Sequence, residues 1–205
     1  GLRNSLALAV HPTSGLIVQA ENSIDIWKGT ITRTSHDEET ALWMSSIDPE
    51  RPADELNLVQ AGKHYGWPYC VDMGIPLPLY RDRVECTEFT DPSVLLPAHA
   101  APFGMAYYNG SLFPELEGNL IVTFHVGRGN GQRIVAYDVE NRGVPKRPPD
   151  RPGGLPGFPQ LVLDKWYEIP NERPKGRPSG LLVANDGRIW FVDYANKTVM
   201  VLMRD

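Results

Sequence analysis

A strand-turn-strand unit that occurs three times in the chain constrains its fold more than any other feature. Each copy joins a short apolar strand to a second strand through a turn that contains glycine, and the copies begin at Leu6, Gly104 and Gly180. Repeats of this kind are typical of arrays of similar β-sheets. Proline-rich loops of variable length separate the copies. The pattern predicts blades of a β-propeller, with function carried by the loops on one face.

The expected strands group into three sheets. The first contains LALAV, LIVQA and ELNLVQ; the second contains GMAYY, NLIVTFH, RIVAYDV and QLVLDKWYE in meander order; the third contains GLLVAN, RIWFVDY and TVMVLMRD. Few segments show the apolar period of a helix, so we expect an all-β chain. A charged insertion over residues 28–53 is expected to be an exposed excursion.

These sheets divide one propeller domain, residues 1–205, into parts. We expect a blade over about 1–69, a loop with both cysteines over 70–98, and blades over 99–170 and 171–205. The smallest common propeller ring has about four blades. Three blades therefore indicate part of a larger domain, and the outer flanks of the terminal blades would be exposed.

Charge and hydropathy exclude two classes of protein. The formal net charge of −5 and the isoelectric point near 5.6 give no basic surface for nucleic acid. No apolar run approaches the roughly 20 residues that span a bilayer. We expect a soluble, globular protein.

Cys70 and Cys86 lie in one proline-rich loop that has no other cross-link. We predict a disulfide between them, because closing such a loop stabilises a fold by about 3 kcal/mol; two free thiols are the alternative. Sequons for N-glycosylation occur at Asn109 and Asn196, in expected surface turns. Together these features favour an extracellular, secreted protein. No signal peptide is visible, and one already removed would not be seen.

Two short segments carry candidate chemistry. Arg3 and Asn4 stand at the entrance of the first strand, where an arginine is most often a solvated or salt-bridged surface group. Asp54 and Glu55 stand close in sequence to the turn Tyr65-Gly66-Trp67-Pro68. Carboxylate oxygens there could bind a hard cation such as calcium. The alternative is a capped strand beside an aromatic corner that packs on the core.

Four segments together resemble the glucose/sorbosone dehydrogenase family of soluble quinoproteins: GLRNSLALAVHPTSGLIVQAEN, ADELNLVQAGKHYGWPYC, PAHAAPFGMAYYNGSLFP and GRPSGLLVANDGRIWFVD. The similarity runs from Gly1 to about Asp193. It implies a six-bladed propeller that binds pyrroloquinoline quinone (PQQ) and calcium and oxidises aldoses or related sugars. The insertion after Asn22 and the cysteine-bearing loop are more similar to fungal secreted members.

The resemblance also implies roles for individual residues. A guanidinium suits charge that develops on a quinone oxygen, so Arg3 is the expected catalytic contributor. Arginines also suit the three carboxylates of the cofactor, although Arg128 and Arg177 could instead be solvated loop residues. The implied cofactor contacts are Arg3, Asn4, His99, His125, Arg128 and Arg177, and the implied metal ligands are the carbonyls of Asn22 and Ser23, with Glu55 and Tyr65 at a second, structural calcium.

Three departures from the family pattern stand out. The chain has Ser5-Leu6 where many members have Pro-Gln, and Glu21-Asn22-Ser23 where well-studied members have Gln-Gly-Pro. The family's general base is a histidine in the first half of the propeller. None of the chain's histidines matches it, and we expect His11 to be structural; the histidines are His11, His36, His64, His99 and His125.

We interpret the chain as the C-terminal half of a secreted, PQQ-dependent sugar dehydrogenase that works with a sugar, an electron acceptor and the remaining blades. The main alternative is a non-catalytic extracellular propeller used for binding or assembly, because one fold hosts many functions. A third hypothesis, a lactonase-like metal hydrolase, would need inward-facing carboxylates, and no clear set is visible.

Overall fold

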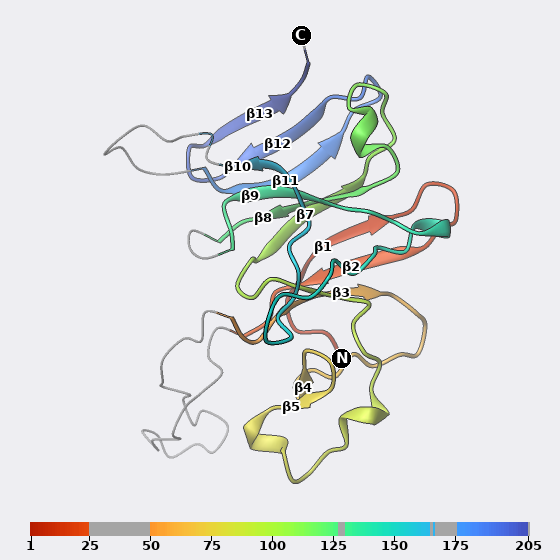
Figure 1. The fold of residues 1–205 in the computed structure, drawn as a ribbon, viewed down its shortest axis with the longest axis vertical. Coiled ribbons are helices and arrows are strands. Elements are labelled where there is room, and N and C mark those ends of the chain that lie inside the picture. Colours follow the sequence, from red (N-terminus) through yellow and green to blue (C-terminus); the bar gives the residue numbers. More distant parts are fainter. Residues whose placement is uncertain (25–49, 127–129, 165, 167–175, 205) are drawn as a thin grey trace.

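A computed structural model describes residues 1–24, 50–126, 130–164, 166 and 176–204. Over these residues the chain is all-β, and its helical turns are short 3₁₀ segments. Three antiparallel sheets follow one another along the long axis of the molecule (Figure 1). The expected insertion over residues 28–53 lies largely outside the described residues. Within them, no helix is long and apolar enough to cross a membrane.

The first sheet has the strand order β1-β2-β3-β6, with β1 at Ser5–Val10, β2 at Ile17–Glu21, β3 at Asp54–Leu58 and β6 at Val94–Leu96. The first three strands are those expected from the sequence. Strand β6 comes from the segment expected to be a loop, and it pairs with β3 through Leu56↔Val94 and Asp54↔Leu96. The apolar side chains of β6 are buried against the core. Pairing with β3 gives the buried backbone groups of β6 their hydrogen-bond partners.

The second sheet is the predicted four-stranded meander, and the third is the predicted three-stranded sheet. Strands β7 to β10 of the second sheet pair in sequence order, and β11 to β13 of the third do the same. Their bounds are β7 Pro102–Tyr107, β8 Leu120–Phe124, β9 Arg133–Tyr137, β10 Gln160–Asp164, β11 Pro178–Val183, β12 Ile189–Asp193 and β13 Thr198–Leu202. The short 3₁₀ turns are η2 Pro78–Tyr80, η3 Cys86–Glu88, η4 Pro114–Leu116 and η5 Asn141–Gly143.

The first strands of the three sheets, β1, β7 and β11, are neighbours in space and run in the same direction. At one end, the Thr123 hydroxyl of the second sheet donates to the Ser179 carbonyl of β11 at 2.7 Å. At the other end, the rings of His11 and Tyr107 meet edge to face at 4.8 Å, so His11 has the packing role expected of it. Equivalent ends of all three sheets therefore lie together, as in propeller blades.

Two buried clusters hold the sheets together. The first lies between the first and second sheets and contains Val18, Leu56, Leu120, Phe124 and Tyr137 among others. The second lies between the second and third sheets and contains Tyr108, Ile121, Ile134, Ile189 and Phe191 among others. Each inner face is apolar because alternate residues of the strands point to it.

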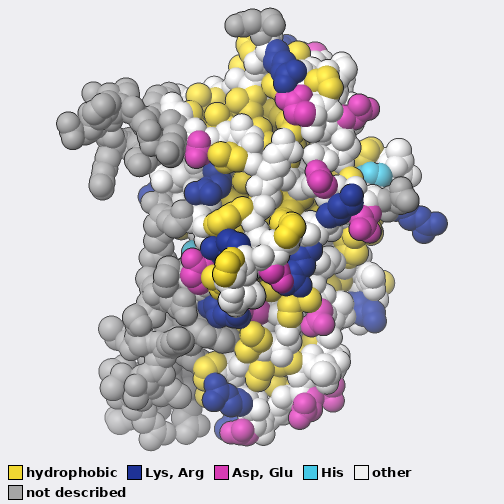
Figure 2. Space-filling view, in the orientation of Figure 1, with side chains coloured by type: hydrophobic (Ala, Val, Ile, Leu, Met, Phe, Trp, Pro, Cys, Tyr) yellow, Lys and Arg dark blue, Asp and Glu magenta, His cyan; other side chains and the backbone are white. Residues whose placement is uncertain are grey.

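The outward faces of the two outer sheets expose apolar side chains. On β1, Leu8 and Val10 are 59% and 58% exposed, and on the third sheet Leu182 and Val199 are 62% and 67% exposed. Hydrophobic side chains are visible at the top of the molecule, where the third sheet lies (Figure 2). Exposed apolar side chains on the outer face of a sheet are typical of a layer that another layer covers.

The disulfide predicted between Cys70 and Cys86 is present, with 6.0 Å between the Cα atoms. It closes the loop that leads to β6 and contains η2 and the two-stranded sheet of β4 (Cys70–Val71) and β5 (Ile75–Pro76). This loop lies at the lower end of the molecule (Figure 1). The disulfide stabilises this irregular segment, which has too little hydrophobic core of its own.

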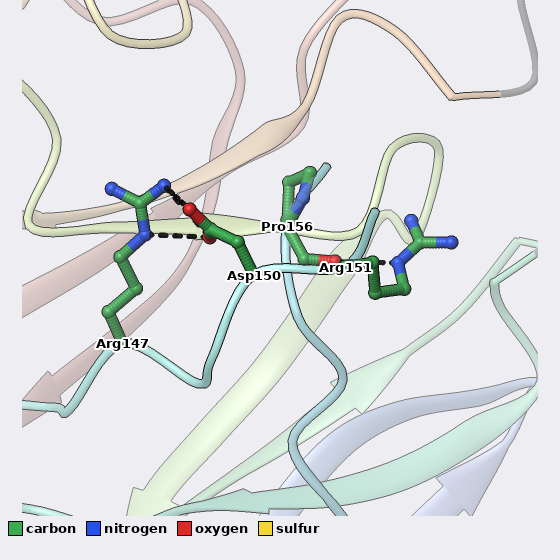
Figure 3. Close-up of polar contacts among 4 residues, drawn as sticks. All are labelled: Arg147, Asp150, Arg151 and Pro156. Atoms are coloured by element: carbon green, nitrogen blue, oxygen red, sulfur yellow. Dashed lines mark hydrogen bonds and ion pairs between the residues drawn. The ribbon is translucent and has the colours of Figure 1, made fainter. Parts of the chain in front are cut away.

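Local polar contacts order the proline-rich segment that precedes β10 (Figure 3). The Arg147 guanidinium donates hydrogen bonds to both carboxylate oxygens of Asp150, and the Arg151 Nε donates to the Pro156 carbonyl at 2.8 Å. The Arg151 guanidinium also lies over the ring of Phe158, 4.4 Å from its centroid. Proline has no backbone N–H to donate to a neighbouring strand. Side-chain hydrogen bonds therefore order this segment in place of backbone hydrogen bonds between strands. A pocket of about 360 Å³ lies between this segment and the end of β9.

Candidate functional site

One end of the sheets collects most of the residues singled out in the sequence. The starts of β1, β3, β7 and β11 lie there, together with the ends of β2, β8 and β12, because neighbouring strands are antiparallel. The described residues brought to this end are Arg3, Asn4, Asn22, Ser23, His99, His125 and Arg177. Arg128 lies outside the described residues.

Arg3 joins the start of β1 to the segment after β2. Its Nη1 donates to the carbonyl oxygens of Asn22 at 2.8 Å and Ser23 at 2.9 Å. The backbone N–H of Asn22 donates to the carbonyl of Asn4 at 3.1 Å, which fixes the two segments side by side. The guanidinium also lies 5.4 Å from the ring centroid of Trp67. Two carbonyls therefore converge on one cationic nitrogen.

Asp54 links the first and second sheets at this end. Its side chain is 1% exposed, and its two carboxylate oxygens accept the backbone N–H groups of Ser23 at 2.8 Å and Ala101 at 2.7 Å. Burial raises the pKa of Asp54 to about 7, although these hydrogen bonds and nearby His99 oppose the rise. The sequence predicts for Asp54 only a place beside a cation, and it does not reveal this bridging role.

The segment between β6 and β7 has an unusual backbone. His99 and Ala101 both adopt positive φ angles, 56° and 51°. Residues with a Cβ rarely adopt this conformation, which costs about 1–2 kcal/mol per residue. Asp54 holds the N–H of Ala101, and the Ala101 carbonyl accepts the N–H of His125 at 2.9 Å. These bonds hold a segment whose His99 side chain is buried.

His125 joins the second and third sheets. Its ring stacks on Phe103 at 4.2 Å and meets the ring of Tyr194 at 5.5 Å. Its Nδ1 lies 3.0 Å from the carbonyl of Pro178, which can only accept, so Nδ1 carries the hydrogen. Burial lowers the pKa of His125 below its usual value. His125 is therefore mainly neutral at pH 7.

Asp193 orders the loop that carries Arg177. The carboxylate is fully buried and accepts the Arg177 N–H at 2.9 Å, the Trp166 Nε1–H at 2.7 Å and the Asn196 Nδ2–H at 2.7 Å. Burial raises the pKa of Asp193, but these hydrogen bonds outweigh it and hold the pKa below its usual value. An ionised Asp193 therefore fixes the backbone from which the half-buried Arg177 side chain projects.

A second group of polar side chains is buried behind the first sheet. The Glu55 carboxylate accepts the Asp72 N–H at 3.0 Å, and the Asn57 amide donates to Gln19 at 3.2 Å. Burial raises the pKa of Glu55 well above its usual value, and the nearby carboxylate of Glu21 raises it further. Among the buried oxygens, Glu21 Oε2 and Asn57 Oδ1 have no hydrogen-bond partner. Such oxygens suit a cation.

Tyr65 has a different role from Glu55. Its hydroxyl donates to the carbonyl of Leu58 at 2.6 Å and accepts the N–H of Gln60 at 2.9 Å. This is the aromatic corner given above as the alternative to a metal ligand. In the part of the chain that the structure describes, no three histidine, cysteine or acidic side chains are close enough to hold a metal together. A cation at this end would therefore depend on carbonyl oxygens.

Comparisons with known proteins identify the family of the chain. A family model described as Glucose / Sorbosone dehydrogenase matches residues 30–144, more than half of the chain. The chain belongs to this family. The family predicted from the sequence motifs is thereby confirmed.

Two curated relatives illustrate the range of similarity. An uncharacterized protein of Borreliella burgdorferi is 26% identical over 209 residues, covering 98% of this chain and 47% of that protein. The aldose sugar dehydrogenase YliI of Escherichia coli is 33% identical over 87 residues, covering 40% of this chain and 23% of that protein.

Solved structures support the fold. The calcium structure of a Trichoderma reesei enzyme of carbohydrate-active family AA12 superposes with a TM-score of 0.71 at 22% identity, covering all of this chain and 52% of that one. The apo form of the E. coli soluble aldose sugar dehydrogenase gives 0.58 at 16% identity, covering all of this chain and 46% of that one. This glucose/sorbosone dehydrogenase family chain thus spans about half the length of its relatives, and its three sheets are blades of a β-propeller.

Proposed function

We propose that the chain is part of a propeller enzyme that oxidises an aldose or related sugar with PQQ, and that it supplies part of the cofactor site. The observation that carries the proposal is the convergence of Arg3, His125 and Arg177, from three sheets, at one end of the molecule. Asp54 and the carbonyl of Pro178 join these sheets by hydrogen bonds. Family membership supports sugar oxidation.

The residues at this end fit an anionic cofactor and a cation. Arg3 and Arg177 would pair with carboxylates, while Asn4 and the buried His99 would complete the contacts. The carbonyls of Asn22 and Ser23, which already face a positive charge, would serve as calcium ligands. Arg128 belongs to the same proposal but lies outside the described residues. When bound, the quinone supplies the oxidant.

The chain's own contribution is electrostatic. Arg3 provides one positive charge at the site. Arg177 provides a second positive charge, and Asp193 fixes its position by accepting the Arg177 N–H. Fixed donors aimed at developing charge are usually the largest single contribution to catalysis. Neutral His125 holds the Pro178 carbonyl and leaves Nε2 as an acceptor. We assign the proton-accepting base to blades outside this chain, because no described histidine occupies the family's position.

The exposed apolar side chains on the outward faces of the first and third sheets support the proposal of further blades as partners of this chain. Each would cover side chains such as Leu8 and Leu182, which are 59% and 62% exposed. The buried oxygens around Glu55 support a structural cation there, with the side chains of Glu21 and Asn57 in place of the Tyr65 hydroxyl. The disulfide supports a secreted protein, since such cross-links persist in oxidising compartments.

Dye-linked oxidation of a panel of aldoses by the full-length protein tests this function. We expect turnover that requires added PQQ and calcium. The 205-residue chain alone should show none, because half a ring leaves the cofactor open to water, which weakens the electrostatic stabilisation. Absence of both PQQ binding and turnover in the full-length protein would instead favour a non-catalytic binding or assembly module.

A further inference from the structure

Arg3 holds the two carbonyl oxygens that a calcium ion at this end would need. Its Nη1 lies 2.8 Å from the Asn22 oxygen and 2.9 Å from the Ser23 oxygen. Calcium binds carbonyl oxygens at about 2.3–2.6 Å. An ion that used both oxygens would therefore take nearly the position of Nη1, and two positive charges cannot share it.

We propose that Arg3 and calcium compete for the Asn22 and Ser23 carbonyls, so that calcium binding releases the Arg3 guanidinium. This inference rests on the proposed function, in which the released guanidinium contacts the anionic cofactor. Without calcium, Arg3 neutralises the carbonyls of its own chain. With calcium, the ion takes over that role and Arg3 becomes available to a ligand. Metal binding then precedes productive cofactor binding.

The surroundings of Arg3 allow the exchange. The side chain is exposed. Besides the two carbonyls it contacts the ring of Trp67 at 5.4 Å, a cation–π contact worth about 0.5–1 kcal/mol at exposed sites. No buried packing has to be broken for the side chain to rotate away. The carbonyls are less free to move, because the Ser23 N–H is held by buried Asp54 at 2.8 Å.

The charge beside the site favours one cation at a time. The Glu21 carboxyl is 5% exposed, and its Oε2 has no hydrogen-bond partner. It lies close to Arg3. A buried carboxyl next to a cation position favours occupancy by a positive charge, whether guanidinium or metal. After Arg3 is released, the charge of the Glu21 carboxyl is therefore neutralised only when calcium has taken the place of the guanidinium.

Calcium titration calorimetry of the full-length apoprotein tests the competition. At the Asn22 and Ser23 carbonyls, Arg3→Ala should bind calcium about five- to tenfold more tightly than the wild type, the size expected when one hydrogen-bonded competitor at an exposed site is removed. Arg188→Ala is the matched control: Arg188 is likewise an arginine over a tryptophan, 5.6 Å from the Trp190 ring, but it lies at the opposite end of the third sheet. Its calcium affinity should equal that of the wild type.

Arginine labelling with phenylglyoxal, read by mass spectrometry, separates release of Arg3 from a simple effect of charge. In the wild type, saturating calcium should raise modification of Arg3 by about the same factor, and Arg188 should not change. If Arg3→Ala leaves calcium affinity unchanged or weaker, if calcium binds without altering Arg3 labelling, or if no calcium binds, the competition is refuted. Dye-linked turnover is measured independently. The first two failures leave the proposed function standing, whereas an absence of calcium binding refutes the competition and turnover then decides the function.

Discussion

No side chain fits between Gly104 of β7 and the carbonyl of Ser179 of β11. A Cβ on Gly104 would collide with the Ser179 oxygen and would lie 3.0 Å from the Leu181 nitrogen. The neighbouring atoms are backbone, so they cannot rotate away. This contact sets how closely the second and third sheets approach each other at the end where His125 and Arg177 lie.

Gly104→Ala should therefore destabilise the protein by about 2–3 kcal/mol, the upper part of the range for overpacking. Gly180→Ala is the control in the 205-residue chain, where a Cβ on Gly180 would meet only Val192 at 3.7 Å. That variant should be neutral or stabilising by up to about 1 kcal/mol, since alanine loses less backbone entropy on folding. Urea unfolding of both variants gives the comparison, and equal stabilities would show that the close approach is incorrect.

Asp54→Asn should destabilise the protein by about 1–3 kcal/mol at pH 7. The amide has one acceptor oxygen, so it cannot accept both the Ser23 N–H and the Ala101 N–H that the carboxylate holds. One N–H would instead face an NH₂ group. Hydrogen exchange should show where the loss falls: the amides of Ser23 and Ala101 should lose protection while those of β12 keep theirs. Unchanged protection at both sites would contradict the bridging role.

His125 should titrate below the usual value for histidine, and this has a consequence for stability. The folded pKa lies below the unfolded value of 6.5, so the unfolded chain binds more protons as the pH falls from about 6.5 through the folded pKa. Stability contributed by neutral His125 is therefore present above pH 6.5 and lost at lower pH.

His125→Phe keeps the stacking on Phe103 but removes the titration and the bond to Pro178. It should lower stability by about 1 kcal/mol at pH 7.5 and reduce the further loss between pH 6.5 and 5. Urea unfolding at these pH values measures both. NMR titration of the wild type should give a pKa below 6.5 with the hydrogen on Nδ1, and a pKa above 6.5 would contradict the assignment.

Some of this architecture could be predicted from the sequence. Strands β1 and β2 could be predicted, because two short apolar runs, LALAV and LIVQA, flank a turn that contains Gly15. Strand β6 could not be found in that way, because three residues are too few to show a period. The role of Asp54 was equally hidden. It depends on Ala101, distant in sequence, being brought to the same point by the packing of two sheets.

The two sequons should differ in occupancy when the protein passes through a eukaryotic secretory pathway. Asn109 is exposed in the turn after β7. Asn196 is half-buried, and its Nδ2, the atom that would carry the glycan, donates to Asp193 at 2.7 Å. Peptide mapping by mass spectrometry should find glycan at Asn109 and little at Asn196. Asp193→Ala should raise occupancy at Asn196, and full occupancy of both in the wild type would contradict the contact.

The central claim is that Arg3 and its neighbours form part of a quinone-dependent sugar oxidation site. The most direct measurement is the anaerobic reduction of bound PQQ by an aldose, followed by absorbance in a single turnover of the full-length protein with saturating calcium. Wild type and Arg188→Ala should reduce the quinone at the same rate, and Arg3→Ala should be slower by a factor on the order of 100 or more, the effect of losing one donor to developing charge. An equal rate in Arg3→Ala would contradict the claim.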